Sequence, residues 1–340
     1  MVELNDPVPA ARATGAVKTA WKRALTGVVA AGMALVLAAC GGGSGNADKG
    51  AGSGLATLKI GVVPAATFAP LFVGVKQGIF KKHGVDLKLD VGGLAPTIFP
   101  RVLKGELDLG ANTWGTLVTA GSNGLPLVGI SPVDRGGDSA GNDYQGLVAR
   151  KGGVKDLKSL EGKTIAVPSL KSFTDSQVRS VLQANGVDTS TIKFLALGFP
   201  DMPSALAQGR VDAASVIEPF LSGVVKQGNT LLAPLSRGQV MGCIVTSKKF
   251  LAENPKAVKA FQAGMQETLA YSKAHPDAVR AALVEGIGLP PESAKAMTLP
   301  IWAPSVTEGD VQAIADMMLK VGGVDKPVKA ADIMAPARGD

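Results

Sequence analysis

KGELDLGANTWGT, residues 104–116, and QGRVDAASVIEPF, residues 208–220, are two copies of one pattern. In each copy a long polar side chain and a Gly precede a charged residue, an apolar residue and an Asp, and small or apolar residues follow. The pattern is typical of a helix end, a tight glycine turn and a buried strand entered through Asp108 or Asp212. We therefore expect two successive α/β units of similar construction.

Strand-like and helix-like stretches alternate through both units. The expected strands cover residues 58–63, 85–91, 106–111, 125–130, 163–167, 192–197 and 211–217. The expected helices cover residues 70–84, 97–104, 113–124, 174–186 and 202–209. Apolar runs between turn signals predict the strands, and helical spacing with recognisable ends predicts the helices. Such alternation implies parallel strands with helices on the sheet faces, which predicts an α/β fold.

Local signals set the ends of several expected helices. Gly84 and Gly186 are expected C-terminal stops, because Gly readily takes the left-handed conformation that ends a helix. Thr97 is the expected N-cap of its helix, and Thr174 with Gln177 has the spacing of a capping box.

Residues 1–39 have the pattern of a secretory signal peptide. A basic flank precedes ALTGVVAAGMALVLAA, residues 24–39, which is short for a membrane span and rich in Ala. The next residue completes LAAC, which resembles the lipobox of bacterial lipoproteins and implies that Cys40 carries lipid. An ordinary signal peptide with an accidental Cys is the alternative. Residues 40–56 are rich in Gly and are expected to form a flexible tether.

The composition argues against several classes of function. Removal of residues 1–39 would take away four basic and two acidic side chains and lower the formal net charge from +7 to +5. The remaining charges are scattered, which disfavours binding to nucleic acid. Cys243 is the one Cys besides Cys40, and His83 and His275 lie far apart, so neither an intramolecular disulfide nor a metal site is expected.

The sequence also lacks the common catalytic motifs. It contains no phosphate-binding loop, no H-E-x-x-H and no Cys–His pair with plausible neighbours. We therefore expect no enzyme activity and no cofactor.

Polar side chains follow the strand in each copy of the pattern. Asn112, Thr113 and Trp114 come after the first strand, and Glu218 comes after the second. Ligands of open α/β sheets bind outside the carboxyl ends of strands, so these side chains are candidates for ligand binding. Trp114 is interpreted either as a pocket wall or as helix packing. Glu218 is either a partner for a cationic or N–H-rich ligand or a carboxylate that orients a hinge.

The two Asp residues of the pattern are interpreted differently. A carboxylate at the entry of a strand can accept backbone N–H groups from the preceding turn. Asp108 and Asp212 are therefore expected to be structural, with ligand contact as the alternative.

Further candidates lie in a loop and at helix starts. Thr67 and Phe68 follow the first strand in the turn-rich stretch PAATFAP, where Phe68 is either a pocket wall or a core residue. Thr97, Ser172 and Thr174 lie at expected helix N-termini, whose hydroxyl and N–H groups can hold a small anion. Capping alone and capping with ligand contact both explain these hydroxyls. A sulfonate, another organic acid, a zwitterion and a pyrimidine all remain candidate ligands.

The order of several stretches resembles a known family. The stretches are LKIGVVPAATFAPLFVGVKQGIFKKHGVDLKL (58–89), KGELDLGA (104–111), GLPLVGI (124–130), DLKSLEGKTIAVP (156–168), ALAQGRVDAASVIEPF (205–220) and ENPKAVKAF (253–261). Together they resemble the solute-binding proteins of ABC importers, in the nitrate, taurine and alkanesulfonate branch that also includes thiamine-pyrimidine binders. The resemblance implies a two-lobed type II periplasmic-binding fold that closes on its ligand. The implied lobes are residues 57–146 plus 241–340 and residues 147–240, with chain crossings near 146–150 and 242–246.

The resemblance also implies a function. The protein would be the extracytoplasmic binding component of an importer, held on the bacterial cell membrane by lipid at Cys40. It would act as a monomer that delivers its ligand to a permease and its ATPase. A lipid-anchored ligand sensor is one alternative. A thiamine-pyrimidine synthase-like enzyme of the same fold is another, but this chain lacks the Cys-rich motif of that branch.

Overall fold

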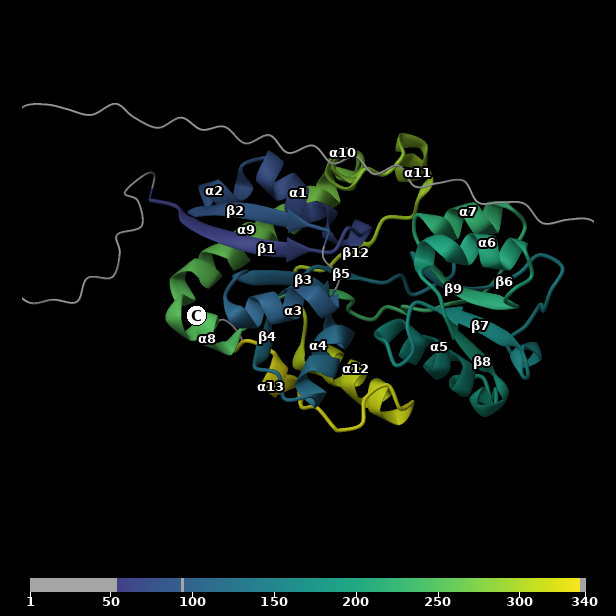
Figure 1. The fold of residues 1–340 in the computed structure, drawn as a ribbon. Coiled ribbons are helices and arrows are strands. Elements are labelled where there is room, and N and C mark those ends of the chain that lie inside the picture. Colours follow the sequence, from purple (N-terminus) through teal and green to yellow (C-terminus); the bar gives the residue numbers. More distant parts are fainter. Residues whose placement is uncertain (1–53, 93–94, 337–340) are drawn as a thin grey trace, which may run out of the picture. The chain divides into compact units, whose positions relative to one another are not determined.

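Two five-stranded sheets covered by helices form the architecture (Figure 1). The computed structural model describes residues 54–92 and 95–336. Their alternating strands and helices confirm the expected α/β fold class. The expected signal peptide and Cys40 lie outside the described residues. Within the described ranges, the helices are too short or too polar to cross a membrane.

The first sheet has the strand order β2-β1-β3-β11-β4. Its strands are β1 (Ala56–Val62), β2 (Val85–Val91), β3 (Leu109–Thr113), β4 (Leu127–Pro132) and β11 (Gly242–Ser247). β1 is parallel to both β2 and β3, whereas β11 is antiparallel to both β3 and β4. Because β11 comes late in the chain, this sheet is completed only by a strand that follows the whole second sheet.

The second sheet has the strand order β10-β6-β9-β7-β8. Its strands are β6 (Gln145–Ala149), β7 (Thr164–Val167), β8 (Lys193–Ala196), β9 (Ala213–Ile217) and β10 (Thr230–Pro234). β7 is parallel to β8 and β9, and β6 is antiparallel to β9 and β10. A separate two-stranded sheet pairs β5 (Asp134–Arg135) with β12 (Ile301–Trp302).

Helices cover both faces of each sheet. The helices packed around the first sheet are α1 (Ala69–Lys76), α2 (Ile79–Lys82), α3 (Ala95–Lys104), α4 (Trp114–Ser122), α8 (Lys248–Glu253), α9 (Pro255–Ala274), α10 (Pro276–Ile287), α11 (Pro291–Ala296), α12 (Glu308–Lys320) and α13 (Ala330–Ile333). Those on the second sheet are α5 (Phe173–Ala184), α6 (Met202–Ala207) and α7 (Phe220–Lys226). We call each sheet with its helices the first and the second lobe. The exact lobe boundaries given above stay a prediction.

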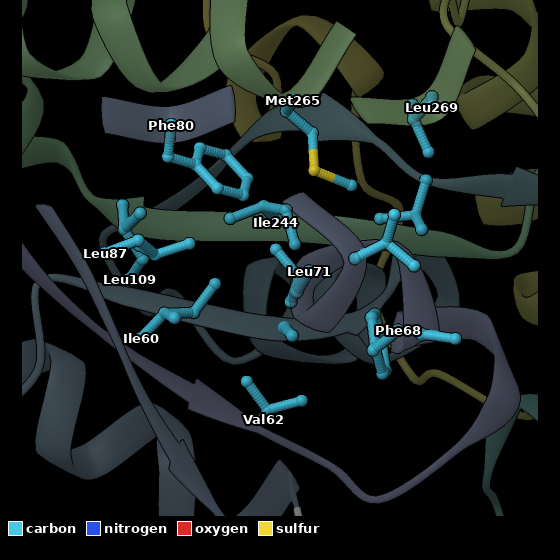
Figure 2. Packing of buried hydrophobic residues seen from close by; sticks show 14 of the residues in the cluster. Ile60, Val62, Phe68, Leu71, Phe80, Leu87, Leu109, Ile244, Met265 and Leu269 are labelled. Atoms are coloured by element: carbon cyan, nitrogen blue, oxygen red, sulfur yellow. The ribbon is translucent and has the colours of Figure 1, made fainter. Parts of the chain in front are cut away.

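Two apolar cores lie on the two faces of the first sheet. One core joins β1 to α1 and α9, and Figure 2 shows Ile60, Leu71 and Met265 in it. The other core contains Ile98 of α3 and Ile314 of α12. Burial of apolar surface on both faces provides the main stabilisation of the lobe and fixes the positions of its strand ends.

The structure corrects two expected helices. Residues 70–84 form two helices, α1 and α2, because the chain turns at Gly78, whose φ of 70° is left-handed. A Gly lies two residues after the end of each helix, Gly78 after α1 and Gly84 after α2. The sequence pattern predicts a stop only at Gly84. The expected N-cap at Thr97 is also wrong, because α3 begins at Ala95 and Thr97 lies inside the helix.

Ser172 is the N-cap of α5. Its Oγ accepts a hydrogen bond from the Asp175 N–H at 3.2 Å. The expected capping box of Thr174 and Gln177 is therefore wrong, because the helix begins at Phe173 and already includes Thr174. Gln177 is buried and instead forms hydrogen bonds with two other glutamines.

The Asp residues of the repeated pattern make the same contact in both lobes. The Asp108 N–H donates to the Lys59 carbonyl at 2.9 Å, and Asp108 Oδ2 accepts from the Lys59 N–H at 2.7 Å. Asp212 and Thr164 exchange the equivalent two bonds at 2.9 and 3.0 Å. The donor belongs to the neighbouring parallel strand and not to the turn, which corrects the expected geometry. Each carboxylate thus fastens the start of its strand to the adjacent strand.

Asp108→Asn and Asp212→Asn should each lower the free energy of unfolding by about 1–3 kcal/mol, because each removes a charged acceptor from a backbone N–H. Urea denaturation of the purified protein measures the change. Asp86→Asn is a matched control on β2, since its partner Lys88 is exposed and the ion pair should contribute no more than about 1 kcal/mol. Full stability of the first two variants, combined with loss of ligand binding, would assign these carboxylates to the ligand.

Candidate functional site

The chain crosses between the lobes twice, and the two crossings pair with each other. The first crossing joins β4 to β6, and the second joins β10 to β11. Backbone hydrogen bonds connect residues 133–137 with residues 238–242, among them one from the Met241 N–H to the Asp134 carbonyl at 2.9 Å. The connection between the lobes therefore begins as an antiparallel ribbon that directly follows β4 and leads directly into β11.

Asp134 connects both crossings through its buried side chain. Its Oδ1 accepts from the Gly242 N–H at 2.7 Å, and its Oδ2 accepts from the Tyr144 hydroxyl at 2.7 Å. The Thr67 hydroxyl donates to the same Oδ2 at 3.4 Å. Burial raises the Asp134 pKa to about 6, although these hydrogen bonds oppose the shift. The carboxylate thus holds both crossings and the loop after β1 at one point.

Thr67 and Phe68 therefore have structural partners. The Thr67 side chain is buried against Asp134, and the Phe68 ring lies in the core of the first lobe, where it is 3% exposed (Figure 2). The loop after β1 is fixed by these two side chains, so a ligand at this strand end would meet a rigid surface.

The carboxyl end of β3 holds two buried donors without acceptors. Asn112 Oδ1 accepts from the Thr113 N–H at 2.9 Å, and the Thr113 hydroxyl caps α4 by accepting from the Thr116 N–H at 3.2 Å. The Asn112 Nδ2 group and the Trp114 Nε1–H, in contrast, find no hydrogen-bond partner among the described residues. Both side chains are almost fully buried, so these donors cannot be satisfied by bulk water.

The start of α5 brings the second lobe to this place. The Phe173 ring packs so closely on Gly115 that a Cβ at Gly115 would lie 2.1 Å from the ring Cγ. Phe173 shares an apolar cluster with Trp114, and Thr174 follows it along the helix, half-buried. The structure thus brings together the predicted site residues at the end of β3 and at the start of α5. Phe173 itself was missed, because an apolar residue at a helix start has no distinctive sequence signal.

Glu218 is buried, and its carboxylate contacts both lobes. It accepts from the Ser222 N–H at 3.2 Å and from the Ser222 hydroxyl, both in its own lobe. Its Oε1 also accepts from the Thr298 N–H at 3.1 Å. Glu218 therefore already has protein donors on both oxygens. Thr97, by contrast, lies on the exposed side of α3.

A pocket of about 570 Å³ lies in the first lobe, within the size range of small-molecule sites. Its walls come from β4, α9, the start of α12 and the segment after α13. Trp114 is the one predicted site residue among its lining residues. Among the residues that the structure describes, no group of three or more His, Cys, Asp and Glu side chains could hold a metal ion.

Comparison with known proteins identifies a family. A profile described as NMT1/THI5 like matches residues 65–279, which is more than half of the chain. A putative binding protein of Brucella abortus is 24% identical over 212 residues, which cover 60% of this chain and 63% of that protein. This chain thus matches somewhat less than two thirds of the length of that relative.

Two further comparisons concern function and fold. A 4-amino-5-hydroxymethyl-2-methylpyrimidine phosphate synthase of Candida albicans is 22% identical over 225 residues, covering 61% of this chain and 64% of the synthase. The crystal structure of the periplasmic aliphatic sulphonate binding protein SsuA from Escherichia coli superimposes with a TM-score of 0.69 at 18% identity, covering 84% of this chain and 94% of that one. The fold is therefore the periplasmic binding protein fold that the family resemblance implies.

Asp134→Asn should change how the stability of the protein depends on pH. The Asp134 pKa is raised from 3.8 to about 6, so the folded state keeps this proton at pH values where the unfolded chain has lost it. The contribution of Asp134 is therefore complete below about pH 4 and declines as the pH rises through about 6, by on the order of 3 kcal/mol. Unfolding of parent and variant from pH 4 to 8 measures the effect, and the parent should lose stability relative to the variant as the pH rises. A constant difference would contradict the raised pKa.

Proposed function

The chain belongs to the NMT1/THI5-like family, and we propose that it is the extracytoplasmic substrate-binding component of an ABC importer. In this role it captures a small organic solute between its lobes and delivers the solute to a membrane permease and its ATPase. The observation that carries the proposal is the pair of buried donors at the carboxyl end of β3, which have no acceptor among the described residues.

The two donors favour a ligand with acceptor atoms. An unsatisfied buried N–H group costs about 1–3 kcal/mol, and an acceptor on a ligand would recover that cost. A sulfonate, a carboxylate or a ring carbonyl has such atoms. Glu218 is already bound by protein donors, so we no longer assign it to a cationic ligand group. Of the other residues derived from the sequence, the proposed contact set keeps Thr67, Phe68, Thr97, Asn112, Thr113, Trp114, Ser172 and Thr174, with Asn112 and Trp114 as the direct donors.

A binding role is favoured over an enzymatic one. The similar synthase raises the enzyme alternative, but burial raises the pKa of the Cys243 thiol well above its usual value and makes a reactive thiolate unfavourable. The His83 imidazole is paired with Glu267 at 2.7 Å. A ligand sensor uses the same fold, and neighbouring genes for a permease and an ATPase would favour import over sensing.

A thermal-shift screen of the purified protein tests ligand capture. The panel contains nitrate, alkanesulfonates, aromatic carboxylates, pyrimidines and amino acids, and a ligand of the site should raise the melting temperature by mass action. Trp114→Phe removes the indole N–H and should weaken binding of the compound found by about 10-fold or more. Trp302→Phe is the matched control in the core of the first lobe and should leave affinity near the parent value. Equal affinity of parent and Trp114→Phe would contradict the proposed donor.

The proposed membrane anchor has its own test. Cys40→Ser removes the thiol that lipid attachment requires, so the variant should accumulate as a precursor or be released from the membrane. Fractionation of cells that express parent or variant measures the partition. Equal membrane association of the two proteins would rule out lipid at Cys40.

A further inference from the structure

Glu218 makes a contact that its position in the second lobe alone would not suggest. The residue lies between β9 and α7, is 5% exposed, and is bound within its own lobe by the Ser222 N–H and hydroxyl. The third donor is the Thr298 N–H, and Thr298 directly follows Met297, which is buried in the core of the first lobe. One carboxylate therefore accepts hydrogen bonds from both lobes at once.

A second group of contacts joins the lobes on the other face of the second sheet. There Phe173 of α5 packs on Gly115, and a Cβ added to Gly323 would lie 2.1 Å from the Ser176 Oγ. Lys171 also pairs with Asp325 at 3.2 Å. Figure 1 shows α5 and α7 on opposite faces of the second sheet, with α11 and the segment after it on the side of α7. The Glu218–Thr298 bond therefore holds the side that the α5 contacts leave unsupported.

We propose that Glu218 is a latch that holds the two lobes together through its ionised carboxylate. Every atom of the latch belongs to the protein, and all three donors are uncharged. A hydrogen bond to an ionised acceptor is stronger than one between neutral groups, and burial strengthens it further because water is excluded. Of the three hydrogen bonds that Glu218 accepts, the one from Thr298 joins the two lobes. This bond therefore stabilises the closed arrangement and is lost when the lobes separate.

The latch deepens the proposed import function and rests on it. When only a fraction of the receptor molecules has the binding-competent arrangement, the apparent affinity falls in proportion to that fraction. By favouring the closed arrangement, Glu218 would raise affinity and slow release without touching the ligand. Glu218 is thus a positioning residue. If removal of its charge changes the affinity for the ligand, the change would reflect lobe closure.

Distances between the lobes in ligand-free protein test the latch. The protein carries Cys40→Ser and spin labels at Lys104→Cys in the first lobe and Lys193→Cys in the second, both exposed sites, while Cys243 is buried. Pulsed electron paramagnetic resonance should show that Glu218→Ala raises the ratio of open to closed molecules by about 10-fold or more. Ser222→Ala is the matched control, because it removes a hydroxyl within one lobe and keeps the Thr298 bond. Its distances should stay close to those of the parent.

Hydrogen exchange provides a second readout that survives if Glu218→Ala folds poorly. Glu218→Gln keeps the size of the side chain and removes its charge, so the Thr298 amide should exchange faster than in the parent while amides in β1 and β7 keep their protection. Unchanged interlobe distances in Glu218→Ala, or unchanged Thr298 exchange in Glu218→Gln, would overturn the latch. Because both measurements are made without ligand, such a failure would leave the import proposal to be decided by the thermal-shift screen.

Discussion

The buried carboxylate of Asp134 is the contact on which the relation between the two lobes depends. It accepts donors from both crossings and from the loop after β1, so the ribbon is fixed to the first lobe at that end. Asp143 does the same at the other end, where it accepts from the backbone N–H groups of Gln145 and Ser236. Burial raises the pKa of both carboxyl groups. Because each end of the ribbon is fixed to its own lobe, a hinge motion would bend the chain between them and leave the binding surfaces themselves unchanged.

Four Asp carboxylates each accept a backbone N–H group from a segment that is distant in sequence. The sequence pattern identified two of them. Asp108 and Asp212 were recognised because their surroundings repeat, and the repeat predicted a structural role. Their donors come from strands 49 and 48 residues earlier, so local pattern could not identify the partner. Asp134 and Asp143 stand alone in their stretches, and their partners in the second crossing lie 108 and 93 residues away. A periodic pattern predicts relations between residues that are close in sequence, whereas these contacts form between distant segments when the sheets are completed.

For the candidate site, too, the sequence could predict some features and not others. The α/β class could be predicted because apolar runs and glycine turns are local signals, and the order of the matching stretches indicated the family. The strand ends were less well predicted, since Asn112 and Thr113 lie inside β3 and not after it. Thr174 failed as a cap because Ser172, two residues earlier, offers an equivalent hydroxyl, and the sequence does not show which one the helix uses. Glu218 has the position expected of a ligand contact, but its donor at Thr298 is a backbone group in a stretch without any motif. The lack of acceptors at Asn112 and Trp114 is visible only once their burial is known.

Burial of the Asn112 and Trp114 donors and contact between the lobes have opposite effects on the free energy of the closed arrangement. Phe173 packs on Gly115, next to Trp114, and the Asn112 and Trp114 donors are buried without acceptors among the described residues. That enclosure is unfavourable, whereas the Glu218–Thr298 bond and the apolar contact of Phe173 are favourable. A ligand that carries acceptor atoms removes the unfavourable part and leaves the favourable contacts in place. The selectivity of such a receptor would then lie in which acceptors reach the end of β3, while the strength of closure would be set by residues that never touch the ligand.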